Sequence, residues 1–150
     1  MSEPNAVRCA RIVVHIDLTD ASIAAVEYGR VLAAALGATL HFIHVVTEPL
    51  SAGWTAEVNP AALPEVQSAM EIESEEWLDA VLPEAEQERF GASLDVEVGQ
   101  VAEEIVRCAQ EHTADLIVVR APRDGRGDKA DTDIAEEVLR RCRCSVFVVR

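Results

Sequence analysis

Short apolar runs rich in β-branched residues alternate with longer amphipathic segments, and this alternation constrains the fold of the chain more than any other feature. Arg11–Ile16 is nearly continuous in apolar residues, which is typical of a strand buried on both faces. Turn and capping residues follow, with Thr19 or Asp20 as the expected N-cap, and apolar residues then recur at helical spacing until Gly37. Thr39–Val46 is a second apolar run. Two strands joined by such a helix predict a parallel, right-handed crossover.

The same alternation continues to the end of the chain. A loop is expected at residues 47–59, and a helix at Leu63–Val81 is expected to kink or end near Pro83. The pattern then predicts strands at residues 93–99, 115–119 and 144–149, and helices at residues 101–112 and 132–142. Five strands and four helices in this order predict one doubly wound α/β domain with a parallel sheet over residues 1–150.

The third expected strand differs from the others because it alternates. Leu94, Val96 and Val98 are separated by Asp95 and Glu97, so one face of this strand is expected to be exposed, which suits an edge position.

Ligands bind doubly wound sheets beyond the carboxyl ends of the strands, where the strand order reverses. The segments to inspect are therefore residues 17–22 after the first strand, residues 45–50 after the second and residues 120–133 after the fourth.

The overall charge and composition exclude several classes of protein. With 27 acidic and 13 basic side chains, the net charge of -14 argues against nucleic-acid binding, which requires a surplus of Lys and Arg. The 49% hydrophobic content argues against a disordered acidic tail. No apolar run reaches the roughly 18 residues that a membrane span needs, and residues 1–7 do not resemble a signal peptide. A soluble cytoplasmic protein is expected.

The cysteines and histidines do not indicate a metal site or a disulfide framework. The four cysteines, at positions 9, 108, 142 and 144, are few and scattered, so reduced and mostly buried thiols are expected. His41 and His44 are three residues apart on an expected strand and therefore point to opposite faces. No metal ligand is predicted. Redox sensing by Cys142 or Cys144 is a further hypothesis, although their spacing is not that of a Cys-x-x-Cys pair.

Several segments, taken in order and at their spacing, resemble the universal stress protein family over nearly the whole chain. They are the strand and Asp at residues 12–17, the Ala-rich helix at residues 22–37, the second strand at residues 38–45, Val98-Gly-Gln-Val-Ala-Glu-Glu-Ile105, Ala114-Asp-Leu-Ile-Val-Val119, and the ending at residues 135–140 and 144–149.

This resemblance implies a flavodoxin-like fold with strand order 3-2-1-4-5 and a homodimer formed through the last strand, here with Cys144, Val146 and Val148. It also implies a choice between two branches of the family. One branch binds ATP or AMP through a Gly-x2-Gly-x9-Gly-Ser/Thr pattern after the fourth strand, where backbone N–H groups and a helix N-terminus meet the phosphates. The other branch lacks this pattern.

In this chain the phosphate pattern is degraded. Arg120 and Arg123 stand where the first two glycines would be, and Thr132-Asp133 stands where the final Gly-Ser would be. A carboxylate at Asp133, which is expected at a helix N-terminus, satisfies the free N–H groups of the helix itself and repels a phosphate.

Other parts of the expected ligand site persist. Gly125 and Gly127 are displaced glycines that leave a rearranged Arg/Gly loop open as a phosphate site, flanked by Val119 and Ile134. By resemblance, Ile16, Asp17 and Val45 form the adenine and ribose side.

The sequence thus indicates a non-catalytic, dimeric stress-response or regulatory protein of the universal stress protein type, with weak or no nucleotide binding and no required cofactor. The alternative is an ATP- or AMP-binding switch that uses the Arg/Gly loop, with slow hydrolysis in that case alone. The chain contains no nucleophile elbow, P-loop or His-Glu-x-x-His motif. A protein partner of unknown identity is left open.

Overall fold

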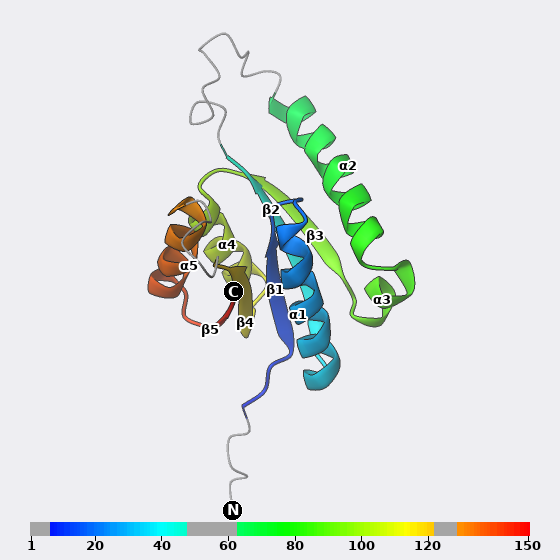
Figure 1. Cartoon of the computed structure of the whole chain (residues 1–150), viewed down its shortest axis with the longest axis vertical. Coiled ribbons are helices and arrows are strands. Elements are labelled where there is room, and N and C mark those ends of the chain that lie inside the picture. Colours follow the sequence, from blue (N-terminus) through cyan, green and yellow to red (C-terminus); the bar gives the residue numbers. More distant parts are fainter. Residues whose placement is uncertain (1–6, 48–62, 122–128) are drawn as a thin grey trace, which may run out of the picture.

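The computed structural model of the chain describes residues 7–47, 63–121 and 129–150, with the backbone alone for Leu63 and residues 129–133. The described strands form one parallel sheet in the order β3-β2-β1-β4-β5 (Figure 1). This confirms the doubly wound α/β fold, the strand order 3-2-1-4-5 and the edge position of β3. The strands are β1 (Arg11–Ile16), β2 (Thr39–Val46), β3 (Ser93–Val98), β4 (Leu116–Arg120) and β5 (Ser145–Val149). The helices are α1 (Ala21–Leu36), α2 (Leu63–Val81), α3 (Glu84–Arg89), α4 (Val101–Glu111) and α5 (Lys129–Arg141).

One short helix, α3, was not expected from the sequence. Pro83 is the N-cap residue of α3 and has an extended backbone, with φ -56° and ψ 145°. Its ring removes a helical N–H and disfavours a helical conformation for the residue before it, so α2 ends here. The predicted end near Pro83 is confirmed, and the chain then forms a second, six-residue helix.

The sequence predicted the C-terminal cap of α1 correctly, but not the side-chain contacts at its N-terminus. Gly37 caps the C-terminus with a left-handed backbone, at φ 66°, as expected. Asp20 occupies the N-cap position, but its side chain makes no capping hydrogen bond. The expected capping role was therefore wrong for the side chain of Asp20, and the local polar bonds instead converge on Asp17.

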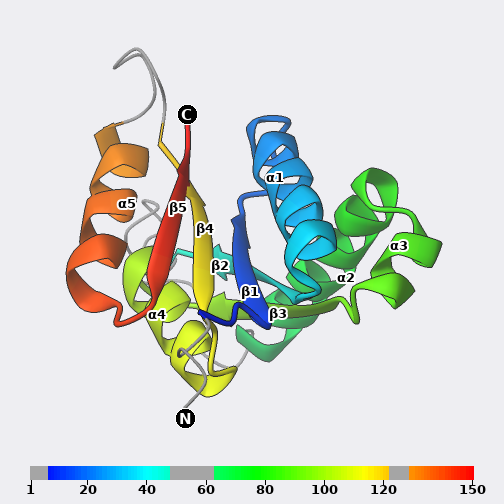
Figure 2. The same cartoon turned by 90° about the horizontal axis from the view of Figure 1, so that it is seen from below.

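Helices cover both faces of the sheet, with α1 and α2 on one face and α4 and α5 on the other (Figure 2). A hydrophobic core lies on each face. One core joins even-numbered side chains of β1 and β2 to α1 and α2, through residues such as Val14, Phe42 and Leu78. The other joins odd-numbered side chains to α4 and α5, through Val13, Ile105 and Val138. β1 and β2 are therefore buried on both faces, which explains their nearly continuous apolar sequence.

Some boundaries differ from those expected. α5 begins at Lys129 rather than at residue 132, and β5 begins at Ser145, so that Cys144 lies just before the last strand. Beyond Thr47, the expected loop at residues 47–59 lies outside the described residues. Within the part of the chain that the structure describes, no helix combines the length and hydropathy that crossing a membrane requires.

Candidate functional site

Asp17 follows β1 directly, at the edge of the sheet where doubly wound folds bind ligands. Its Oδ1 accepts a hydrogen bond from the backbone N–H of Thr19 at 2.9 Å and others from the hydroxyls of Thr19 and Ser22. The backbone N–H of Asp17 donates to the Ser22 hydroxyl at 2.8 Å. Leu18 completes this turn with a left-handed backbone, at φ 62°. The turn therefore fixes the orientation of the carboxylate and engages one of its two oxygens.

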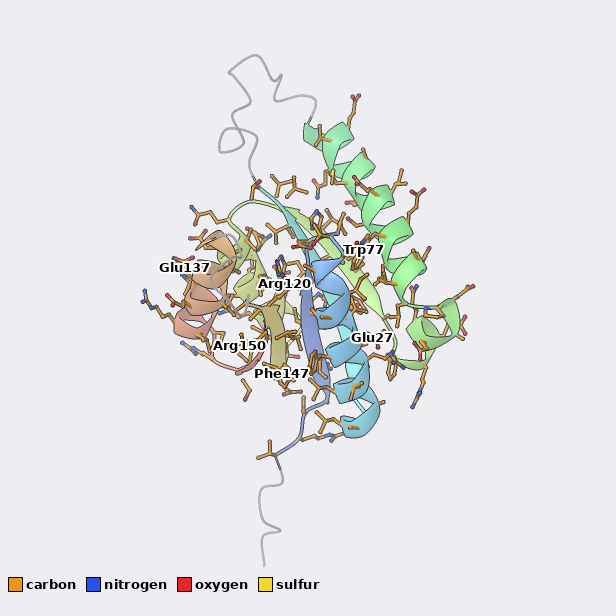
Figure 3. All side chains as sticks on the ribbon, in the orientation of Figure 1. Glu27, Trp77, Arg120, Glu137, Phe147 and Arg150 are labelled. Carbon is orange, nitrogen blue, oxygen red and sulfur yellow. The ribbon has the colours of Figure 1, made fainter. Side chains whose placement is uncertain are left out.

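The second oxygen of Asp17 faces a cation across the edge. Arg120, labelled in Figure 3, is the last residue of β4, the strand beside β1. Its Nη2 lies 3.8 Å from Asp17 Oδ2. Burial raises the pKa of Asp17, but hydrogen bonds from Ser22 and Thr19, together with Arg120, outweigh this and hold the pKa below its ordinary value. Asp17 is thus an anion paired with Arg120 at neutral pH.

Three other expected site residues lie at this edge with buried side chains. Ile16 and Val119 have no exposed side-chain surface, and Val45 is buried. Ile134 is half-buried and packs against the core on the α4 and α5 face. The structure therefore brings the expected strand ends together. At Ile16, Val45 and Val119, however, only the backbone groups can contact a ligand, because the side chains are buried.

The expected phosphate loop falls mainly outside the described residues. Arg123, Gly125 and Gly127 lie in the segment 122–128, which the structure does not describe. Thr132 and Asp133 are described by their backbone alone, within α5. Because α5 begins at Lys129, Asp133 lies more than one turn into the helix and not at its first residue, which corrects the expected position.

Two histidines at the carboxyl edge were missed by the sequence analysis. His44 donates through Nδ1 to the Ile16 carbonyl at 3.1 Å. Burial lowers the pKa of His15 to about 4; the charge of Asp17 opposes this, and His44 and Arg120 reinforce it. His15 precedes Asp17 by two residues, so both side chains point to the same face of the strand. This spacing was the sequence signal that could have placed His15 near the site.

All four cysteines are free thiols, and Cys108 alone among them is fully buried. The expectation of mostly buried thiols is therefore wrong for Cys9, Cys142 and Cys144, which are half-buried. The Cys142 thiol donates to the Cys144 carbonyl at 3.4 Å. Burial, followed by the neighbouring Cys142, raises the pKa of Cys144 to about 11, which disfavours the reactive thiolate that redox sensing requires.

The last strand and α1 share an aromatic contact. The rings of Tyr28 and Phe147 have centroids 5.2 Å apart, and Phe147 lies beside α1 (Figure 3). Val146 and Val148 are half-buried and pack on the opposite face of the sheet, against the core beneath α4 and α5.

Comparison with known proteins identifies the family of this fold. The sequence matches the Universal stress protein family over residues 9–150. A search of curated proteins found no significant match.

Several solved structures share the fold. A protein from the universal stress protein family from Burkholderia pseudomallei is 27% identical, with a TM-score of 0.65 over 97% of this chain and 98% of that chain. The universal stress protein UspA from Lactobacillus plantarum is 24% identical, with a TM-score of 0.68 over 95% of this chain and 99% of that chain. A universal stress protein from Archaeoglobus fulgidus, solved in complex with dAMP, is 15% identical, with a TM-score of 0.57 over 96% of this chain and 99% of that chain. The order of the strands, the sequence match over nearly all residues and these structures agree, and the chain belongs to the universal stress protein family.

Proposed function

We propose that this universal stress protein is a dimeric regulatory protein without catalytic turnover, and that it binds adenine nucleotides weakly or not at all. We further propose that it consists of a single domain and is located in the cytoplasm. The observation that carries this proposal is the pairing of Arg120 with Asp17, at 3.8 Å.

The pair affects both halves of the expected nucleotide site. Arg120 stands where nucleotide-binding relatives have the first glycine of their phosphate pattern, so a long side chain replaces the bare backbone that would approach a phosphate. Its guanidinium also engages the carboxylate on the expected adenine and ribose side. A nucleotide has to displace this ion pair before it can hydrogen-bond to Asp17, and that displacement costs affinity.

The absence of turnover is supported by the chemistry at the same edge. Asp17 is oriented by Ser22 and Thr19 and charge-paired with Arg120, so it is a weak general base. His15 is neutral and half-buried. The residues around it in the sequence do not form a known motif that pairs a histidine with a hydroxyl or thiol nucleophile.

Dimerisation through the last strand is supported by the edge position of β5. The Val149 carbonyl accepts a hydrogen bond from the Ala121 N–H at 2.7 Å, so Val149 faces β4. Because backbone groups alternate along a strand, those of Val148 face away from β4, where a strand of a second copy could pair with them. Beside this edge, α1 exposes 46% of Tyr28 and 57% of Val31, an apolar surface that a second copy of the chain would cover. The free thiols are consistent with a reducing compartment such as the cytoplasm.

Calorimetric titration of the chain with Mg-ATP, ADP and AMP tests the proposal. We expect dissociation constants weaker than about 0.1 mM for all three nucleotides, with no significant increase in melting temperature. A dissociation constant in the micromolar range for any of them contradicts weak binding and favours the alternative.

The alternative is a nucleotide-dependent switch that holds ATP or AMP with the Arg/Gly loop around Gly125 and Gly127. It is supported by the retained Asp17 at the end of β1 and by the dAMP complex of the Archaeoglobus fulgidus relative. The double variant Thr132→Gly, Asp133→Ser separates two causes of weak binding. A gain in ATP affinity locates the defect at Thr132 and Asp133, and no gain locates it in the loop or at Arg120.

A further inference from the structure

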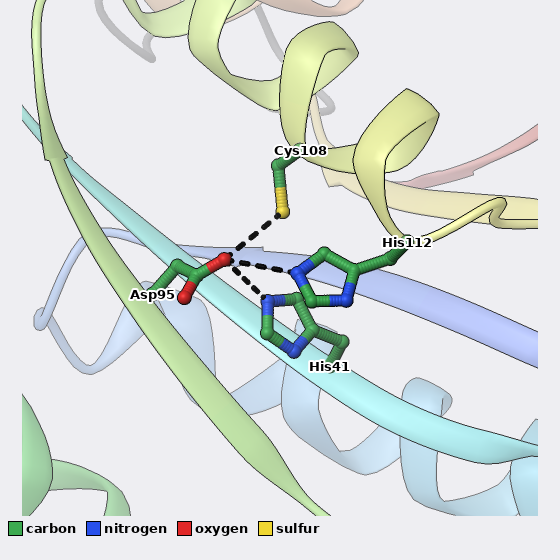
Figure 4. A group of neighbouring side chains, drawn as sticks. All are labelled: His41, Asp95, Cys108 and His112. Carbon is green, nitrogen blue, oxygen red and sulfur yellow. Dashed lines mark hydrogen bonds and ion pairs between the residues drawn. The ribbon is translucent and has the colours of Figure 1, made fainter.

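Four side chains with metal-binding atoms converge on the face of the sheet that α4 covers. They are His41 of β2, Asp95 of β3, Cys108 of α4 and His112, the residue that caps the C-terminus of α4 (Figure 4). One ligand atom from each residue can be chosen such that all four lie within 4.8 Å of one another. His41 and Cys108 are buried, while Asp95 and His112 are half-buried.

The topology of the sheet and the period of the helix produce this convergence. Asp95 pairs with Ile43 in the register of β2 and β3, and Ser93 pairs with His41, so His41 and Asp95 are diagonal neighbours on one face. Cys108 and His112 are four residues apart and lie on the same side of α4. α4 packs on the face of the sheet that carries His41 and Asp95.

The distances from Asp95 to the other three residues are close to those between the ligands of a tetrahedral site. Asp95 Oδ2 lies 3.0 Å from His41 Nε2, 3.0 Å from His112 Nε2 and 3.9 Å from Cys108 Sγ. Zinc–ligand bonds of about 2.0–2.1 Å to nitrogen or oxygen and 2.3 Å to sulfur place tetrahedral ligands about 3.3 Å apart, or about 3.6 Å for pairs with sulfur. Small side-chain movements therefore convert these contacts into a coordination shell.

A second layer of contacts supports the same geometry. The other ring nitrogen of His41, Nδ1, is hydrogen-bonded to the Ser93 hydroxyl. Metal-binding histidines nearly always use their second nitrogen in this way, which fixes the ring orientation. The His41 and His112 rings stack with centroids 3.6 Å apart, so both Nε2 atoms point at the same oxygen of Asp95.

From this convergence we propose that His41, Asp95, Cys108 and His112 form a binding site for one divalent transition-metal ion, with Zn²⁺ as the best chemical match. The set contains imidazole, carboxylate and thiol groups, which zinc accepts together. The Asp95 carboxylate and the Cys108 thiolate together neutralise a divalent charge, while both imidazoles bind as neutral rings. Binding forms four metal–ligand bonds and releases the thiol proton to solvent.

Burial raises the pKa of Cys108 to about 12, and the charge of Asp95 adds to this effect, so metal binding has to displace the thiol proton. Burial lowers the pKa of His41, which keeps the ring in the neutral form that a metal requires.

An ion can reach the cluster from solvent. A cavity of about 340 Å³ is lined by His41 and His112, together with Ser93, Glu111 and Thr113. The side chains of His112 and Asp95 are 37% and 36% exposed. Glu111 and Arg11 both line this cavity, so the charges at its rim balance, and access rests on the exposure of His112 and Asp95.

No metal site was expected from the sequence, because His41 and His44 lie on opposite faces of their strand. The structure agrees for that pair, since His44 contacts Ile16 at the carboxyl edge. The partners of His41 come instead from β3 and α4.

Titration of the chelator-treated full chain with Co²⁺, followed by absorption spectroscopy, tests the site. We expect one ion per chain, visible d–d bands with the intensity of tetrahedral cobalt, a thiolate-to-cobalt charge-transfer band, and displacement of cobalt by an equivalent of Zn²⁺. A weak octahedral spectrum, no charge-transfer band, or no saturable binding overturns the proposal.

Variants then locate the ion. Cys108→Ser is expected to abolish the charge-transfer band, and His112→Gln to weaken Zn²⁺ binding by about 100-fold or more. Because Cys108 is buried, circular dichroism checks the fold of its variant, and the half-buried His112 provides a second test that leaves the core intact. Cys142→Ser and His44→Gln are matched controls and should bind as the parent chain does. Unchanged binding in Cys108→Ser and His112→Gln, or equal losses in the two controls, places the ion elsewhere and overturns the proposal.

Discussion

Arg120 and Asp17 face each other across the carboxyl edge of the sheet, with Nη2 3.8 Å from Oδ2. The two residues end neighbouring strands, β4 and β1, and are separated by more than a hundred residues of sequence. Their pairing joins the position expected for the first glycine of the phosphate pattern to the carboxylate on the expected adenine and ribose side.

Removal of this pair should improve nucleotide binding. Arg120→Gly restores the glycine and frees Asp17, so we expect the AMP dissociation constant to fall by about tenfold, which corresponds to about 1.4 kcal/mol. Isothermal titration calorimetry of the variant beside the parent chain measures this change. Arg120→Lys keeps a cation near Asp17 and serves as the control. An unchanged AMP affinity in Arg120→Gly shows that the pair is not what limits binding.

The proposed dimer should depend on the outward-facing backbone of Val148. Val148→Pro removes an N–H that points away from β4, so it should prevent pairing between two β5 strands without removing a hydrogen bond to β4. We expect light scattering to give a dimer mass for the parent chain and a monomer mass for the variant. Thermal unfolding at low protein concentration provides the control that the variant monomer is folded. A dimer in the variant, or a monomeric parent, contradicts pairing through β5.

Gly29 allows α1 to approach β1 closely. A Cβ at this position would lie 2.8 Å from Val14 Cγ2, closer than side-chain packing permits. Gly29→Ala should therefore lower the free energy of unfolding by about 1–3 kcal/mol, although alanine normally favours a helix over glycine. Urea denaturation measures this effect. The exposed Ala35→Gly on the same helix is the control, and it should lose only about 1 kcal/mol through helix propensity.

The stability of the fold should decrease in mild acid because of His15. Its pKa is about 4 in the folded state and 6.5 in the unfolded state, so between these values the unfolded chain binds more protons. Stability attributable to this group is therefore constant above about pH 7, falls as the pH decreases from 6.5 to 4, and is constant again below that range. We expect a loss of about 1–3 kcal/mol, since one pKa unit corresponds to about 1.4 kcal/mol.

Urea denaturation at several pH values, with chelator present, checks this prediction against His15→Gln. The variant keeps Asp17, His44 and Arg120, the charged or titratable neighbours of His15, so any difference in slope reports His15 itself. Identical pH dependence in the two proteins contradicts the assignment.

The sequence predicted the elements well because local patterns determine them. β1 and β2 are buried on both faces and read as continuous apolar runs, and Gly37 supplies the left-handed residue that ends α1. The prediction was less accurate where the signal was weak. α3 lacks a buried residue of its own, so no apolar period marked it, and the start of α5 is a polar segment without apolar spacing.

The sequence also predicted some features of the candidate nucleotide site and not others. The order of strands placed Asp17 and Arg120 at one edge of the sheet, because the carboxyl ends of parallel strands lie together. The direct pairing of their side chains depends on the adjacency of β1 and β4, which the pattern of either strand does not contain.

The cluster of His41, Asp95, Cys108 and His112 shows what only the tertiary structure decided. The alternation of β3 correctly placed Asp95 on the opposite face from Leu94 and Val96, but α4 covers that face, so Asp95 is half-buried and not solvent-exposed as expected. Periodicity states which residues share a face, but it does not state which strand lies beside that face or which helix covers it. The sequence by itself determined the secondary structure, the two faces of the sheet and the position of the carboxyl edge. Contacts between distant segments decided the rest: the pairing of β3 with β2 and the packing of α4 bring these four side chains within ligand distance of one another.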